Sequence, residues 1–261
     1  MAFHWAEESA KQKDSYGLAL LADCYYLGIG TEANHKKTAE LYQLAADQGN
    51  AGAMTALGCL YSMGDGVEKN EKAAFDLFIE AAGQDEWRAQ EHLSIMYRDG
   101  ICVKKDEQLA FEWMKKAAKV ENYETQSLLG EYYIEGIGTE KNIEEGLRLL
   151  NISANQGYYS AQFVLGMYYL EGKYLPQDVN KGLELLEKAA EQNYRGAQEI
   201  LGYCYLTGEY IGEVNLMKGY AFMQQAEQNG SEYAKNMLKS FRTTMESVFN
   251  ALETTGKKGG N

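Results

Sequence analysis

The stretch AMTALGCLYSMGDG, residues 53–66, decides the fold because its pattern returns along the chain at intervals of 36 residues. Comparison of the chain with itself at this shift shows four columns that keep one residue type in six copies. Two columns hold Leu21, Leu57, Leu93, Leu129, Leu165 and Leu201, and Tyr25, Tyr61, Tyr97, Tyr133, Tyr169 and Tyr205. The other two hold Gly28, Gly64, Gly100, Gly136, Gly172 and Gly208, and Ala46, Ala82, Ala118, Ala154, Ala190 and Ala226. Such a period is typical of a protein built from stacked repeats.

Each repeat opens with the pattern of an amphipathic helix, which we call helix A. In the second copy, Ala53, Leu57 and Tyr61 are four residues apart and form one apolar stripe. The residue after the Leu is small in every copy, as Gly58 is here, which predicts close approach of a second helix backbone. Gly64 follows the Tyr by three residues and is expected to end the helix in the left-handed conformation.

A second helix, helix B, follows each loop. Its expected N-caps are Asn34, Asn70, Asp106, Asn142 and Asp178, with Asn215 one residue late in the sixth copy. A large apolar residue stands four before the recurring Ala, as Tyr42, Phe78, Met114, Leu150, Leu186 and Phe222. Helix B ends at Gly49, Gly157 or an Asn or Asp in their place. Helices of about 12 residues are marginal alone, so they must bury their stripes against neighbours.

These elements predict an all-α fold, a right-handed α-α superhelix (solenoid) of six 36-residue helical-hairpin repeats with terminal capping helices. The repeats are expected at 15–50, 51–86, 87–122, 123–158, 159–194 and 195–230. Residues 1–14 match the second half of a repeat and predict a lone helix B. Residues 231–253 predict a C-terminal capping helix with the stripe Tyr233, Met237 and Phe241, and residues 254–261 a disordered tail.

The pattern A-x3-LG-x2-Y-x2-G-x-G, followed by an N-cap and a helix ending A-A-x2-G, resembles the Sel-1-like repeat. The clearest copies are residues 53–66 and AQFVLGMYYLEG, residues 161–172, and the likeness covers residues 15–230. The resemblance implies a tetratricopeptide-like solenoid that serves as an adaptor for protein partners. A secreted, cysteine-rich subgroup of the family is associated with β-lactam binding or hydrolysis. This chain lacks the paired cysteines of that subgroup, so its chemistry is not carried over.

The charge balance narrows the choice of partner. A net charge of −13 argues against nucleic acid and against an anionic membrane surface, since both require a basic face. An acidic protein attracts basic partner surfaces instead. The first residues lack the pattern of a signal peptide, and no window is apolar enough for a transmembrane helix. Cys24, Cys59, Cys102 and Cys204 show no regular pairing, so we expect a cytoplasmic protein.

The search for catalytic chemistry is negative, and no enzyme activity, cofactor or metal is expected. The chain contains no SxxK, GxSxG, HExxH, Walker A or EF-hand motif. His4, His35 and His92 stand at unrelated repeat positions without a partner at ligand spacing. Cys24 and Cys204 share an otherwise apolar column and are expected in the core, whereas Cys59 is expected at the concave face, where it would be mildly reactive.

In tetratricopeptide-like solenoids, helix A lines the concave face. The residues two and five after the recurring Leu, with Phe163 from the position two before it, are therefore expected to point into a groove. The predicted partner-binding residues are Tyr26, Ile95, Arg98, Glu131, Ile134, Phe163, Met167, Leu170, Tyr203 and Leu206. Those of repeats five and six are unexpectedly apolar. They form either an exposed patch for an apolar peptide or helix, or a structural contact covered by neighbouring repeats.

Three functions fit the sequence. The first is a scaffold or adaptor that binds a protein or peptide, preferably a basic one, as a monomer or weak dimer. The second is a dedicated inhibitor, such as an immunity protein that covers the active site of a toxin. The third and least favoured is a β-lactam hydrolase of the cysteine-rich kind. A single stoichiometric partner would indicate the inhibitor, and several partners would indicate the adaptor.

Overall fold

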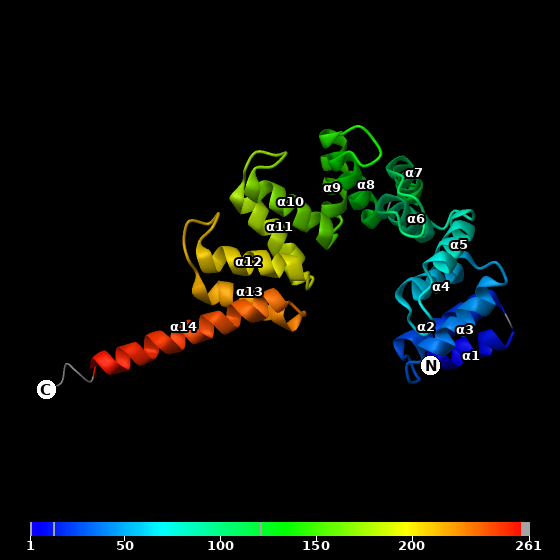
Figure 1. Cartoon of the computed structure of the whole chain (residues 1–261), viewed down its shortest axis with the longest axis horizontal. Coiled ribbons are helices and arrows are strands. Elements are labelled where there is room, and N and C mark those ends of the chain that lie inside the picture. The colour runs from blue at the N-terminus through cyan, green and yellow to red at the C-terminus, as the bar shows by residue number, and fades with distance from the viewer. Residues whose placement is uncertain (1, 13, 121, 257–261) are drawn as a thin grey trace. The chain divides into compact units, whose positions relative to one another are not determined.

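The structure is a computed structural model, and it describes residues 2–12, 14–120 and 122–256. Within this part the regular elements are all helices (Figure 1). They are α1 (Ala2–Lys11), α2 (Ser15–Leu27), α3 (His35–Ala46), α4 (Ala51–Met63), α5 (Glu71–Ala82), α6 (Trp87–Asp99), α7 (Glu107–Ala117), the 3-10 turn η1 (Ala118–Val120), α8 (Tyr123–Glu135), α9 (Ile143–Asn155), α10 (Tyr159–Glu171), α11 (Val179–Glu191), α12 (Arg195–Thr207), α13 (Leu216–Gln228) and α14 (Glu232–Gly256). No helix among the described residues combines the length and apolar character needed to cross a membrane.

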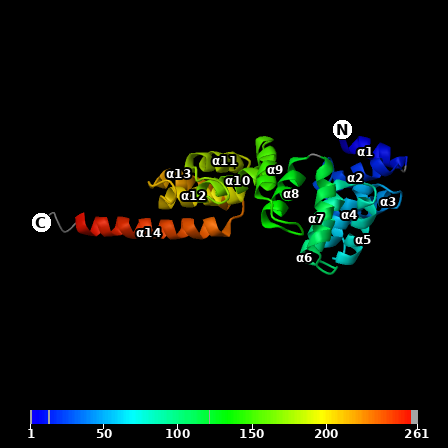
Figure 2. The same cartoon turned by 90° about the horizontal axis from the view of Figure 1, so that it is seen from above.

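The chain forms two compact units, residues 1–146 (unit 1) and 147–261 (unit 2). In unit 1, each helix from α1 to α7 packs on the next along the chain, and in unit 2 the same holds from α10 to α14 (Figures 1 and 2). The tightest pairs are the A and B helices of one repeat, such as α4 with α5 and α12 with α13. This arrangement confirms the predicted all-α solenoid of helical hairpins.

Glycines end the A helices as predicted. Gly28, Gly64, Gly100, Gly136, Gly172 and Gly208 are C-caps with φ between 68° and 78°. Each cap amide donates to the carbonyl four residues earlier, as Gly64 does to Leu60. The six C-caps therefore use the conformation that glycine adopts without steric cost.

Asn and Asp side chains begin the B helices, again as predicted. Asn34, Asn70, Asp106, Asn142, Asp178 and Asn215 each accept a hydrogen bond from the backbone amide three residues on, at 2.9–3.0 Å. The backbone amide of each cap also donates to the carbonyl of the recurring Tyr, as Asn70 does to Tyr61 at 2.9 Å. The cap residue thus bonds to the start of helix B through its side chain and to the end of helix A through its backbone amide.

The small residues after the recurring Leu allow the two helices of a hairpin to touch. A Cβ added to Gly58 would lie 2.6 Å from the ring of Phe78, which is fully buried on α5. A Cβ on Gly166 would lie 2.9 Å from Leu186 and 3.1 Å from the carbonyl oxygen of Gly182. These distances confirm the predicted close approach, and they leave no room for a larger side chain.

The loop of the sixth repeat holds one additional residue, as the late cap Asn215 indicated. Asn215 stands seven residues after Gly208, whereas the other caps stand six after their Gly. The additional residue shifts the buried face of α13 by one position. Met223 is therefore fully buried, and Phe222, predicted for this place, is only half-buried.

The same shift moves the buried stripe of α14. Ala234 and Leu238 are buried, whereas Tyr233 is 47 % exposed and Met237 and Phe241 are half-buried. The prediction that Tyr233, Met237 and Phe241 form the buried stripe was therefore wrong by one residue. The helix also continues to residue 256, three residues beyond its expected end at 253. Residues 257–261 of the predicted disordered tail lie outside the described part of the chain.

Candidate protein-binding surface

Two residues predicted to bind a partner are fully buried, and a third packs inside its hairpin. Ile134 and Leu170 have no exposed surface. Leu206 is half-buried and packs beside the core cluster of Met223 and Leu238. We therefore remove Ile134, Leu170 and Leu206 from the candidate surface.

These three side chains are enclosed because each lies opposite a glycine on the facing B helix. A Cβ on Gly146 would lie 2.4 Å from Ile134, and one on Gly182 would lie 2.9 Å from Leu170. In the sixth repeat, a Cβ on Gly219 would lie 2.7 Å from Leu206. A large side chain on helix A thus fills the space that a glycine leaves on helix B. The first three repeats carry Thr38, Ala74 and Ala110 in place of this glycine, opposite Tyr26, Ser62 and Arg98.

The remaining candidates of unit 1 are half-buried on the A helices. They are Tyr26, Ile95, Arg98 and Glu131. The ring of Tyr26 contacts His35 edge to face at 5.2 Å, and His35 Nδ1 lies 3.0 Å from Asp65 Oδ2. Arg98 is held by two bonds to the carboxylate of the adjacent Asp99, at 2.7 and 2.9 Å. Unit 1 thus offers a mixed polar face on which the basic side chain of Arg98 is already paired.

Carboxylates on this face are held away from water. Burial, together with the nearby carboxylate of Glu124, raises the pKa of Glu91 to about 7, while Arg88 opposes the shift. Burial also raises the pKa of Glu131, and Arg98 opposes it. A carboxylate held in this way is costly to ionise, so a cation from a partner would stabilise its charged form.

The raised pKa of Glu91 makes stability depend on pH. Its pKa in the folded protein lies above the ordinary value of 4.5, so the folded chain binds this proton more tightly than the unfolded chain does. The stability that this proton contributes to the folded state is fully present below about pH 4.5 and is lost as the pH rises through 7.

Glu91→Gln should therefore be more stable than the wild type at pH 8, with a smaller gain or none at pH 5. Urea unfolding at pH 5 and at pH 8 measures the free energy of unfolding. Glu112→Gln, at an exposed position, is the control. An equal effect of Glu91→Gln at both values would contradict the expectation.

The cysteines and histidines form no metal site within the described residues. Cys24 and Cys204 are buried, as predicted. The Sγ atom of Cys59 lies 3.2 Å from Nε2 of His92, whose ring stacks on Phe78 with centroids 4.6 Å apart. Burial raises the pKa of Cys59 to about 11, so the thiol is protonated at neutral pH and is not activated as a nucleophile. The sequence did not indicate this contact, because the two residues lie 33 positions apart.

Unit 2 presents aromatic side chains on its A helices. Tyr159, Phe163 and Met167 are spaced by four residues on one face of α10, and Tyr194 stands at the start of α12. The ring of Tyr194 lies 5.0 Å from that of Tyr159 and 5.1 Å from that of Phe163. Tyr159 is 39 % exposed, and the other three are half-buried. We call these four residues the aromatic patch.

Tyrosines stand in place of the usual side-chain caps before two A helices of unit 2. Asp14, Asn50, Glu86 and Asn122 cap the A helices of unit 1 with their side chains. The same position holds Tyr158 before α10 and Tyr194 before α12, and neither makes a side-chain cap bond. A missing cap costs on the order of 1 kcal/mol. A local rule broken in this way is expected where a surface serves binding rather than stability.

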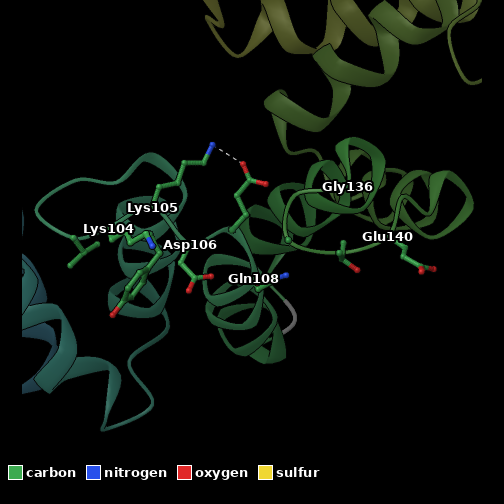
Figure 3. Close-up of a pocket in the computed structure, with 11 residues that line it drawn as sticks. Lys104, Lys105, Asp106, Gln108, Gly136 and Glu140 are labelled. Carbon is green, nitrogen blue, oxygen red and sulfur yellow. Dashed lines mark ion pairs between the residues drawn. The ribbon is translucent and has the colours of Figure 1, made fainter.

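A polar pocket of about 1040 Å³ lies between the loops of the third and fourth repeats (Figure 3). Tyr97, Lys104, Lys105 and Glu140 contribute to its walls, and Lys105 pairs with Glu107 at 2.7 Å. A smaller pocket of about 470 Å³ occupies the matching place in the second repeat. This recurrence indicates a groove that belongs to the repeat architecture, so we do not assign it a ligand.

Comparison with known proteins agrees with this architecture. A family model described as the Sel1 repeat matches residues 1–14, 15–50, 51–86, 87–120, 124–158, 160–194 and 196–231. No curated protein matches the sequence.

Solved structures share the fold. A Sel1 repeat protein from Oxalobacter formigenes is 26 % identical with a TM-score of 0.77, over 85 % of this chain and 88 % of that one. A protective antigen of uropathogenic Escherichia coli is 26 % identical with a TM-score of 0.63, over 93 % of this chain and 52 % of that one. An immunity protein from Pseudomonas aeruginosa is 24 % identical with a TM-score of 0.59, over 79 % and 81 %.

Proposed function

The chain belongs to the Sel1 repeat family, and from this premise we propose that it is a non-enzymatic scaffold or adaptor that binds a partner protein through its A helices. The observation that carries the proposal is the aromatic patch of unit 2. Tyrosine and phenylalanine supply large contact areas at low entropic cost and dominate the binding energy of many protein interfaces. Tyr203, which follows on α12 at the repeat position of Met167, extends the same face.

The charge of the chain favours a basic partner. The net charge is −13, and Glu91 and Glu131 on unit 1 are carboxylates that an incoming cation would stabilise. On unit 2, Arg195, which follows Tyr194 of the aromatic patch, lies 3.7 Å from Glu199. We therefore expect faster association with a basic partner at low salt than at high salt.

The aromatic patch is tested by substitution with a matched control. Tyr159→Ser with Phe163→Ser should weaken partner binding roughly thirtyfold or more, as expected for the loss of a hot-spot residue. Tyr123→Ser is the control, because Tyr123 stands at the repeat position of Tyr159 in unit 1 and is 46 % exposed. The measurement is quantitative affinity capture from the source organism, followed by titration of the retained partner. Leu206 is unsuitable for this test, since it packs against Gly219.

The helicity of each variant is checked by circular dichroism. A folded double variant that retains its partner at wild-type affinity would show that the patch is structural. Loss of binding in Tyr123→Ser alone would instead place the interface on unit 1.

A dedicated inhibitor is the second candidate. It is supported by the fold that the chain shares with two immunity proteins from Pseudomonas aeruginosa and by its acidic charge, since many toxins that attack nucleic acids or membranes are basic. The same capture experiment separates the two functions. One partner retained at a fixed stoichiometry indicates an inhibitor, and several partners indicate an adaptor.

A further inference from the structure

The start of α13 exposes apolar side chains at positions that are polar in the other repeats. Met217 is the second residue after the N-cap Asn215 and is 87 % exposed. The other five B helices that follow a loop have at this position Lys36, Lys72, Gln108, Glu144 and Asn180. Val214, directly before the cap, is 55 % exposed, and three other repeats have at its position Lys69, Lys105 and Lys141. Apolar side chains exposed together at one helix start indicate a surface for a partner.

A groove of about 450 Å³ lies between α13 and α14 at this place. Its walls include Leu216, Met217 and Tyr220 of α13, with Phe241 and Arg242 of α14. The rings of Tyr220 and Phe241 lie 5.7 Å apart, and Nε of Arg242 donates to the hydroxyl of Tyr220 at 3.2 Å. The groove is therefore apolar, with one exposed guanidinium group at its edge.

The groove is open because no loop folds back over the start of α13. In unit 1, the loop after a helix A covers the first residue of the preceding helix B. A Cβ on Gly66 would lie 2.2 Å from the carbonyl oxygen of His35, and one on Gly138 would lie 1.8 Å from that of Glu107. The six A helices before α14 have 13 residues each, whereas α14 has 25 and continues past the groove.

The second half of α14 extends beyond α13 (Figures 1 and 2). Phe241 and Arg242 line the groove together with Leu216, the first residue of α13, so the residues that follow them have no helix of this hairpin beside them. The sequence of this half, MESVFNALETTG (residues 245–256), has apolar residues at 245, 248, 249 and 252, the spacing of an amphipathic helix. A helix of about 12 residues is marginal in water unless its apolar stripe is covered.

We propose that a second copy of the chain occupies the groove, with its α14 antiparallel to the α14 of the first copy. Residues 245–256 of each copy lie against the groove of the other, about a two-fold axis near Met245. A two-fold interface is self-complementary, so one contact covers both the groove and the apolar stripe of each copy. This surface is separate from the aromatic patch, which lies on α10 and at the start of α12.

The distribution of charge along α14 favours the antiparallel arrangement. The charged residues of its first half are Glu232, Lys235, Lys239 and Arg242. Those of its second half are Glu246 and Glu253. Within the described part of the chain, neither Lys239 nor Arg242 forms an ion pair, and the hydroxyl of Tyr220 is the partner of Arg242. An antiparallel copy brings an acidic half beside these two cations, whereas a parallel copy would bring like charges together.

The mass of the full chain in solution tests this self-association. Sedimentation velocity at about 5 to 500 μM should show monomer converting to dimer, as expected for a small, transient interface. Met217→Lys places in the groove the residue that α3 and α5 have at this position, and it should raise the dimer Kd at least about tenfold, as for a hot-spot residue. Met63→Lys is the matched control, because Met63 is 59 % exposed on α4 of unit 1 and should leave the Kd unchanged.

Two outcomes of the sedimentation experiment overturn the proposal. A wild type that stays monomeric over the whole range would leave the groove to a different protein. A dimer that is equally stable in Met217→Lys, with helical content unchanged by circular dichroism, would place the interface elsewhere on the chain.

Charge reversal tests the antiparallel arrangement. Arg242→Glu and Glu246→Arg each place like charges opposite one another in a dimer of identical copies, and each should raise the Kd about fivefold. An equimolar mixture of the two variants pairs opposite charges at both ends of the interface, so it should recover the wild-type Kd. A mixture that associates no better than its separate components overturns the proposal.

Discussion

Phe78→Ala is expected to destabilise unit 1 by about 3–5 kcal/mol, the cost of removing a large aromatic side chain from a packed core. Phe78 is 1 % exposed. Its ring covers Gly58 on α4 on one side and stacks on His92 of α6 with centroids 4.6 Å apart. The side chain therefore joins two consecutive repeats, and neither neighbour can move into the space without breaking other contacts.

The loss of stability in Phe78→Ala is measured by urea unfolding, monitored by far-ultraviolet circular dichroism. Ile79→Ala is the matched control on the same helix, because Ile79 is 40 % exposed and should cost less than about 1 kcal/mol. If the Phe78 variant were no less stable than the Ile79 variant, stacking between repeats would not depend on this contact.

Gly182→Ala is expected to destabilise unit 2 by about 2–3 kcal/mol through overpacking. The added Cβ would lie 2.9 Å from the carbonyl oxygen of Gly166 and 2.9 Å from Leu170. The first of these neighbours is backbone, so α10 and α11 must separate to admit the methyl group. This result opposes intrinsic propensity, since Ala in a helix is more favourable than Gly by about 1 kcal/mol.

The sign of the change in the free energy of unfolding distinguishes overpacking, which lowers stability, from helix propensity, which raises it. Gly52→Ala is the control, because Gly52 lies in α4 with only a 3.4 Å neighbour at Asn50, and it should gain about 0.5–1 kcal/mol. Adding Leu170→Ala to Gly182→Ala should relieve the clash with the side chain but not with the Gly166 carbonyl. If Gly182→Ala stabilised the protein as Gly52→Ala does, the hairpin would not depend on close backbone contact.

The candidate surface was only partly predictable from the sequence. Phe163 and Met167 were named from their repeat positions, and both belong to the half-buried aromatic patch. Tyr159 and Tyr194 were missed because they stand at the start of their helices, outside the positions taken to face a partner. A usable signal was present, however. The A helices of unit 1 begin after Asp, Asn or Glu, whereas in unit 2 this column holds Tyr158, directly before Tyr159, and Tyr194.

The pairing of Ile134 with Gly146 also left a trace in the sequence. Where helix A carries Ile or Leu five residues after the recurring Leu, helix B carries Gly, and elsewhere it carries Thr or Ala. Considered one helix at a time, Ile134 and Leu170 appear to be exposed apolar residues. Considered as a pair with the facing glycine, they are core residues.

By itself, the sequence determined the repeat length, the helix caps and the buried Leu column, because these depend on contacts within one helix or one loop. Tertiary structure decided the burial of Ile134 and Leu170. This burial results from side chains that lie 12 residues from the facing glycine and meet it only when the helices pack, as Ile134 meets Gly146 and Leu170 meets Gly182. A local pattern specifies which residues are apolar, but the facing helix decides which of them are enclosed.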